Sequence, residues 1–113
     1  MENQKENVTM PSELKISVLL KKEGPFWVAQ CLQHDVAGQG QTIQDACYQV
    51  ERAIVGHIVH DMENRLEPLS KLPRAPSEYW KMWGKAEPLP DRPADPFSSD
   101  SGSPFIKPEI RVS

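Results

Sequence analysis

The chain has 113 residues, enough for one domain, and carries 13 Lys+Arg against 16 Asp+Glu, a formal net charge of −3. No segment is strongly basic, no apolar run approaches the roughly 20 residues that span a bilayer, and residues 1–9 lack the hydrophobic core of a signal peptide. These features argue against a membrane protein and against a basic nucleic-acid-binding face, and they predict a cytoplasmic protein.

Three strands are predicted after a polar N-terminal segment, 1–11, that we expect to be disordered. Residues 14–21 alternate apolar and polar positions, the pattern of a half-buried strand. Residues 22–25 have turn chemistry, and residues 26–32 follow with two apolar faces, so we expect a hairpin whose second strand is the more interior. Residues 36–41 form the predicted third strand, with a bulge at one of its glycines.

A long amphipathic helix is predicted from Thr42 to about Arg65. The Thr42 hydroxyl can accept from the amide three residues on, where Asp45 suits the positive end of a helix. Apolar residues then recur at spacings of three and four. A second apolar stripe, Val55, Val59, Met62 and Leu66, indicates that the C-terminal segment or another subunit packs on the late half of the helix.

The remainder of the chain contains nine of the 11 prolines. Residues 77–86 predict a short helix whose aromatic face, with Trp80 and Trp83, docks onto the long helix or the sheet edge. Residues 87–104 predict a proline-rich linker, and residues 105–113 a returning edge strand, since Pro108 cannot donate a ladder hydrogen bond. The fold class is therefore α+β, with one domain over residues 12–86 in which a three-stranded antiparallel sheet packs against one long helix.

Residues 14–66 carry a recognisable series of structural elements. Trp27-Val28 lies in the second strand, Gly38-Gln39-Gly40 in the third, and Thr42-Ile43-Gln44-Asp45-Ala46 begins the helix. In this series the segment resembles the N-terminal domain of the HicB antitoxins. The resemblance covers about half of the chain, and the residues that carry it are structural rather than catalytic.

The resemblance implies a degenerate ribonuclease-H-like fold without catalytic acids, which masks a small basic toxin, HicA, and forms dimers or tetramers. The mild acidity of the chain suits such a partner. Two departures limit the comparison. The loop at residues 33–38 lacks the proline-glycine turn common in the family, and the proline-rich tail contains neither a helix-turn-helix nor a ribbon-helix-helix, so we do not expect DNA binding.

Two groups of residues in the sequence have the chemistry of reactive sites. Cys31, His34, His57 and His60 include zinc-ligand types, but the spacing of a structural zinc site is not otherwise reproduced. His34 and Asp35 could form an acid/base pair beside Cys31, yet adjacent residues of an extended segment point to opposite faces. We therefore expect no metal, no cofactor and no enzymatic activity, and we expect Cys31 and Cys47 to be buried and to form no disulfide.

The predicted function is the binding of a protein partner, either a HicA-like toxin or another small basic protein. The alternatives are a structural homo-oligomer, with a dimer favoured, and a small nucleic-acid-binding module. We expect the late part of the long helix to be either a subunit interface or the seat of the two tryptophans. The residues predicted to form the partner or oligomer surface are His34, Asp35, Val55, Val59, Met62, Trp80 and Trp83.

Overall fold

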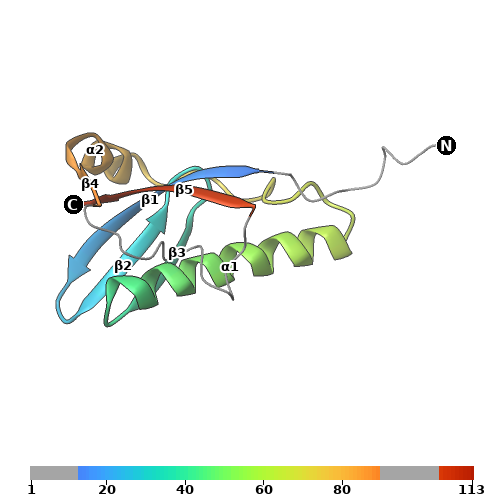
Figure 1. The fold of residues 1–113 in the computed structure, drawn as a ribbon. Helices are drawn as coiled ribbons and strands as arrows, with labels where there is room; N and C mark the ends of the chain where they lie inside the picture. The colour runs from blue at the N-terminus through green and yellow to red at the C-terminus, as the bar shows by residue number, and fades with distance from the viewer. Residues whose placement is uncertain (1–12, 90–104) are drawn as a thin grey trace.

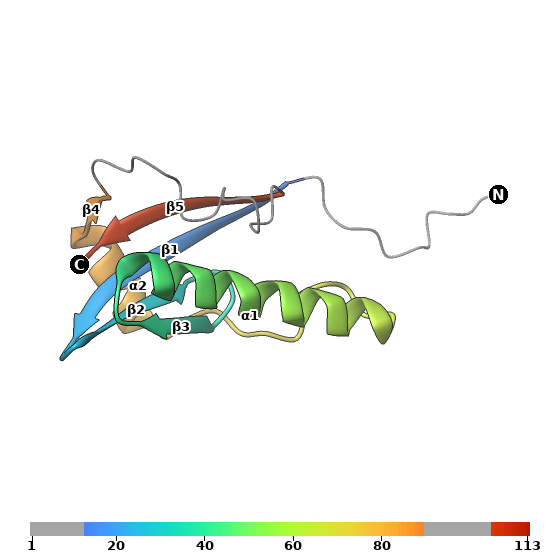
Figure 2. The same ribbon diagram turned by 60° about the horizontal axis from the view of Figure 1, so that its bottom comes forward.

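A computed structural model describes residues 13–89 and 105–113. Residues 1–12 and 90–104, which include the N-terminal segment and most of the linker predicted above, lie outside the described residues. Five strands form one mixed sheet in the order β3-β2-β1-β5-β4, and two helices lie on its opposite faces (Figures 1 and 2). The elements are β1 (Leu14–Glu23), β2 (Phe26–Cys31), β3 (Val36–Gly40), α1 (Ile43–Glu63), α2 (Ser77–Lys85), β4 (Glu87–Pro88) and β5 (Ile106–Val112).

The α+β class is confirmed, but the prediction of three strands is wrong. β1, β2 and β3 form the expected antiparallel meander, while β5 returns to pair with β1 in parallel orientation. The middle strand of the sheet is therefore β1, whereas the sequence predicted β2 as the more interior strand of the hairpin. Val18, Leu19 and Leu20 of β1 have no exposed surface because both faces of the strand are covered.

The position of β5 agrees only partly with an edge strand. The two residues of β4 pair with Val112 and Arg111, so β5 is the second strand from this edge. The Ile110 carbonyl accepts from the Leu89 amide, which shows that even-numbered residues of β5 direct their backbone groups away from β1. Pro108 belongs to this set and lies before the short β4, so its missing N–H interrupts no pairing with β1.

The start of α1 is confirmed: the Thr42 side chain accepts from the Asp45 amide at 3.0 Å. The predicted bulge in the third strand is wrong, because β2 and β3 stay in continuous register from Cys31↔Val36 to Trp27↔Gly40. Gly38 is explained instead by the approach of α1. A Cβ at Gly38 would lie 2.8 Å from the Ala46 carbonyl oxygen and closer still to the Val50 amide nitrogen.

A main core lies between the sheet and α1, and a second core lies between the sheet and α2. The second core consists of Leu19, Leu32 and Ala75, with aromatic residues of α2 packed against them. The prediction that the short helix docks on the long helix or on the sheet edge is therefore wrong: α2 covers the opposite face of the sheet from α1 (Figure 1). The sequence pattern predicts the apolar face of α2 but not the surface of the protein against which this face packs.

The inner side of the late part of α1 is covered by the segment that follows it. Leu69 is 2% exposed, and Leu72 packs against the same core as Ile58 and Met62. Along the second stripe the cover is partial, since Val55, Met62 and Leu66 are half-buried. It leaves Val59 on the outer side with 47% of its surface exposed.

Candidate functional site

The loop between β2 and β3 holds His34 and Asp35, whose side chains have different partners in the structure. Asp35 Oδ1 accepts from Gln30 Nε2 at 2.8 Å, and the Asp35 amide donates to the Pro73 carbonyl at 2.7 Å. The bond to Pro73 fastens the loop to the segment that precedes α2. Asp35 therefore has a structural partner for its carboxylate and another for its backbone.

His34 packs toward Leu69 rather than toward the carboxylate of Asp35. Burial lowers the pKa of His34, while a hydrogen bond with the Leu69 backbone acts in the opposite direction. The Nδ1 atom is buried and has no hydrogen-bond partner among the described residues. The arrangement favours a neutral imidazole held between two loops.

Cys31 and Cys47 form no disulfide and have no exposed surface. Burial raises the pKa of the Cys31 thiol, although hydrogen bonds with the backbone of His34 and Gln33 oppose the shift. A thiol in this state is a poor nucleophile. Within residues 13–89 and 105–113, no three His, Cys, Asp or Glu side chains converge into a group that could hold a metal ion.

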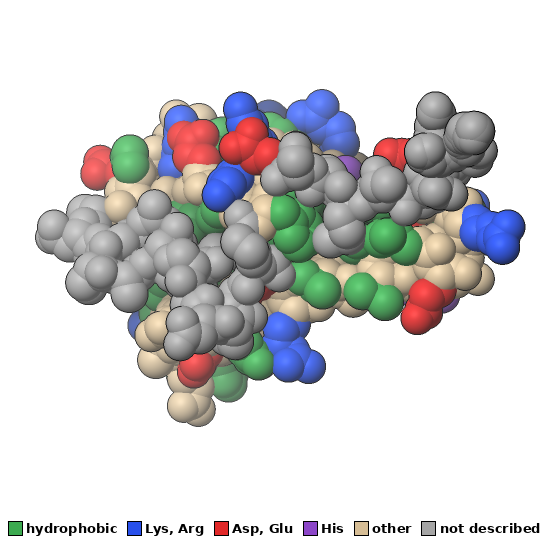
Figure 3. Space-filling model, turned by 45° about the vertical axis from the view of Figure 1, so that its right-hand side comes forward, with side chains coloured by type: hydrophobic (Ala, Val, Ile, Leu, Met, Phe, Trp, Pro, Cys, Tyr) green, Lys and Arg blue, Asp and Glu red, His purple; other side chains and the backbone are tan. Residues whose placement is uncertain are grey.

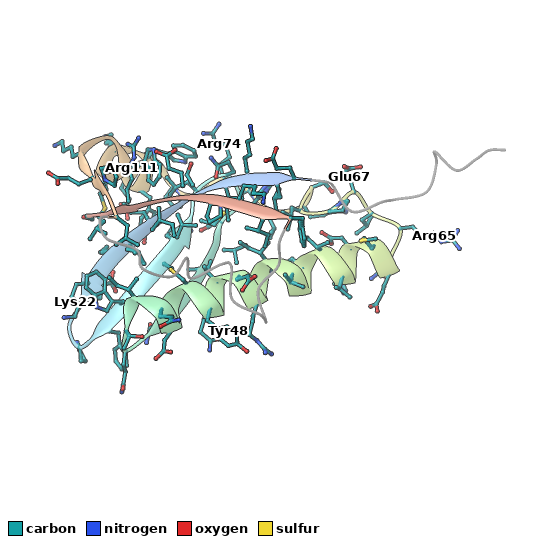
Figure 4. The ribbon with its side chains drawn as sticks, viewed as in Figure 1. Lys22, Tyr48, Arg65, Glu67, Arg74 and Arg111 are labelled. Atoms are coloured by element: carbon teal, nitrogen blue, oxygen red, sulfur yellow. The ribbon has the colours of Figure 1, made fainter. Side chains whose placement is uncertain are left out.

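One side of α1, between its core-facing and its fully exposed surfaces, carries a row of apolar and aromatic residues, which we call the α1 stripe; two of them, Val55 and Met62, also pack against the main core. Val55 and Met62 are half-buried, Val59 is exposed, and Tyr48 is 36% exposed. Arg52 continues the row: its guanidinium lies 5.5 Å from the Tyr48 ring centre and donates to the Tyr48 hydroxyl at 3.0 Å. Figure 3 shows apolar side chains along this helix, and Figure 4 shows Tyr48 on the side of α1 away from the sheet.

Sequence reasoning identified Val55, Val59 and Met62 but missed Tyr48 and Arg52. The five residues of the α1 stripe follow one another at spacings of four, three, four and three. That spacing places them on one side of a helix and could have identified Tyr48 and Arg52 as well. The structure brings these five residues together and keeps them apart from His34 and Asp35, which lie in the β2–β3 loop.

Trp80 and Trp83 belong to the second core, on the opposite face of the sheet from the α1 stripe. They are therefore not seated on Val55, Val59 and Met62. Each carries an arginine on its ring: the guanidinium of Arg74 lies 4.2 Å from the Trp80 ring centre, and that of Arg111 lies 4.3 Å from Trp83. Both arginines lie on the α2 side of the sheet (Figure 4).

A surface groove with a volume of about 250 Å³ lies across β1 and β5. Two strands that are far apart in the sequence form it, so sequence reasoning gave no sign of it. The residues that line it are Lys15, Ile16, Ser17, Gln33, Lys107, Pro108 and Glu109.

Comparisons of the chain with models of protein families, with curated proteins and with solved structures found no match. Neither described helix combines the length and apolar composition needed to cross a bilayer. The functional argument therefore depends on the surfaces of the molecule itself.

Proposed function

We propose that the chain is a non-catalytic, HicB-like protein-binding domain that masks or regulates a small basic protein partner through the α1 stripe. The observation that carries this proposal is the exposure of Val59 and Tyr48, 47% and 36%, on one side of the longest helix. Exposed apolar residues gathered in one row are typical of interaction surfaces, while scattered ones are not.

The composition of the α1 stripe supports a protein rather than a small molecule as the ligand. Tyr, Met and Arg are enriched in protein interfaces, and Tyr and Arg are among the residue types that contribute most of the binding free energy. The alternating spacing of four and three residues is that of a seam between two packed helices. A helix of the partner laid along α1 would bury this row.

The charge of the chain and the sequence resemblance support the kind of partner. A net charge of −3 favours association with a basic protein over an acidic one. The antiparallel meander followed by one long helix is the arrangement that the resemblance to HicB antitoxins leads one to expect. The ribonuclease-H-like relationship and the antitoxin role are parts of the same proposal.

The test uses two variants that place the same charge on different sides of α1. Val59→Asp alters the α1 stripe, whereas His57→Asp alters an exposed residue on another side of the same helix turn. Each tagged protein is expressed in the natural host cells, and proteins that co-purify in stoichiometric amounts are identified. We expect one small basic protein with the wild type and with His57→Asp, but not with Val59→Asp.

The captured protein is then expressed alone. We expect it to arrest growth, and we expect co-expression of the wild-type chain, but not of Val59→Asp, to restore growth. Capture of the partner by Val59→Asp at wild-type level would exclude the α1 stripe as the binding surface. Recovery of the wild type only with copies of itself, dissociated by Val59→Asp, would favour a homo-oligomer over the antitoxin.

A further inference from the structure

The groove across β1 and β5 has a charge that differs from that of the whole chain. Lys15 and Lys107 lie opposite each other on two adjacent parallel strands and point to the same face. Neither ammonium forms an ion pair with a described residue. Like charges placed side by side on a sheet destabilise it, so this pair needs an explanation.

The one carboxylate at the groove does not neutralise the lysines. Glu109 Oε2 accepts from Arg111 Nε at 3.2 Å and from Arg111 Nη2 at 3.0 Å. Both bonds end on one carboxylate oxygen, and they pair the charge of Glu109 with Arg111 of the same strand. Among the described residues, the two lysine charges therefore remain without a counter-charge at the groove, in a protein whose overall charge is −3.

Ser17 of β1 adds a directed donor at the groove. Gln33 Oε1 accepts from the Ser17 amide at 2.7 Å, and Gln33 Nε2 donates to Ser17 Oγ at 2.9 Å. The hydroxyl oxygen is thus already an acceptor, which leaves its hydrogen for a further acceptor. The Gln33 side chain fixes this geometry from the β2–β3 loop.

We propose that this groove binds a phosphate group, either as inorganic phosphate or as the phosphate of a small phosphomonoester. Two ammonium groups and one hydroxyl donor suit an oxyanion with several acceptor oxygens and more than one negative charge. A phosphate between Lys15 and Lys107 would also remove their mutual repulsion. The groove lies on the opposite face of the sheet from α1, so this inference does not depend on the proposed protein partner.

Binding is measured by titrating the ¹⁵N-labelled full chain with inorganic phosphate, then with O-phosphoserine, at constant ionic strength maintained with chloride. We expect saturable shifts of the amide signals of residues 15–17 and 109 with at least one of the two ligands. Saturation with phosphoserine identifies the phosphomonoester, and saturation with inorganic phosphate alone identifies the free ion. Shifts that do not saturate with either ligand would overturn the proposal.

Matched lysine variants test whether these residues are responsible. The double variant Lys15→Gln/Lys107→Gln should weaken the affinity for phosphate at least about tenfold, because it removes both charged donors. Lys81→Gln/Lys85→Gln removes two exposed lysines of α2 and should leave the affinity unchanged. An equal loss in both double variants would show non-specific charge attraction and would overturn the site.

Thermal unfolding provides a second readout that does not depend on signal assignment. Phosphate should raise the Tm of the wild type but not that of Lys15→Gln/Lys107→Gln, because a ligand stabilises only the state that binds it. In phosphate-free buffer the double variant should unfold at the same temperature as the wild type or higher, since repulsion between the two lysines is gone. A double variant that phosphate stabilises as much as the wild type would contradict the proposal.

Discussion

The carboxylate of Asp61, near the end of α1, accepts a hydrogen bond of 2.8 Å from the backbone amide of Leu69. Leu69 has a φ of 67°, a conformation that is unfavourable for a leucine, and yet its side chain is 2% exposed. Asp61 itself is only 6% exposed. One buried hydrogen bond therefore holds a strained turn in place and seats a core residue beneath the late half of α1.

Replacement of Asp61 should destabilise the fold through this turn. Asp61→Ala leaves the buried Leu69 amide without its acceptor, and we expect the free energy of unfolding to fall by about 1–3 kcal/mol. Urea denaturation followed by circular dichroism measures the change. Asp61→Asn keeps an oxygen at the same position and should lose less. Equal losses in the two variants would show that the hydrogen bond to Leu69 is not the cause.

Replacement of glycine by alanine should lower stability at Gly38 and raise it at Gly56. A Cβ at Gly38 would meet backbone atoms of α1, so Gly38→Ala should force the helix away from β3 and lower stability by more than about 2 kcal/mol. At Gly56 no described atom beyond the adjoining residues and the helix's own backbone lies within 4 Å of the added Cβ. Gly56→Ala should therefore raise stability by about 0.5–1 kcal/mol, because alanine is the better helix former.

Both glycine variants are compared with the wild type by urea denaturation. A loss of stability in Gly56→Ala would indicate that another chain approaches α1 at this position. A neutral Gly38→Ala would mean that β3 and α1 can separate without loss of packing. Either result would change the account of how α1 lies on the sheet.

Arg111 joins β5 to α2 and should contribute to stability through more than its charge. Its guanidinium lies over the Trp83 ring and donates from Nη1 to the Trp83 carbonyl at 3.0 Å, near the end of α2. We expect Arg111→Ala to lower the free energy of unfolding by about 1–3 kcal/mol. Glu109→Gln removes only an exposed ion pair and should change stability by less than about 1 kcal/mol.

Tryptophan fluorescence separates this contact from general destabilisation. Arg111→Ala should shift the emission of the native protein, because a cation is removed from the face of Trp83. Arg111→Lys keeps the charge but not the planar group, and we expect it to restore only part of the stability. Full recovery with lysine would show that charge alone accounts for the effect.

The parts of the fold that follow from local patterns were predicted from the sequence, and the parts that depend on distant pairing were not. The alternation of β1 and the cap at Thr42 are local signals, so these elements begin where expected. The parallel pairing of β5 with β1 joins the two ends of the domain, and no local pattern indicates it. The same holds for α2, whose apolar face was evident but whose position on the sheet was not.

The candidate sites also divide into one that a local pattern predicts and one that depends on distant pairing. Val55, Val59 and Met62 were found because helical spacing is visible in one segment. The groove was missed because Lys15 and Lys107 come together only when β5 pairs with β1. The groove also depends on Gln33 of the β2–β3 loop, whose side-chain oxygen accepts from the Ser17 amide of β1. Such a contact is a product of tertiary structure.

The partly buried imidazole of His34 should make stability depend on pH near neutrality. Burial lowers the pKa of His34 in the folded protein, so the unfolded chain binds a proton more readily. Stability should therefore be greatest above the pKa of an unfolded histidine, about 6.5, and should fall as the pH drops through that value. The loss ends once the pH is below the folded pKa, because both states are then protonated.

Urea denaturation of the wild type and of His34→Gln between about pH 7.5 and pH 5.5 tests this dependence on His34. We expect the denaturation midpoint of the wild type to decrease across this interval and that of His34→Gln to decrease less. His57→Gln removes an exposed imidazole and should retain the wild-type slope. A slope that His34→Gln leaves unchanged, or that His57→Gln abolishes, would place the titrating group elsewhere and would argue against a neutral His34 packed against the Leu69 turn.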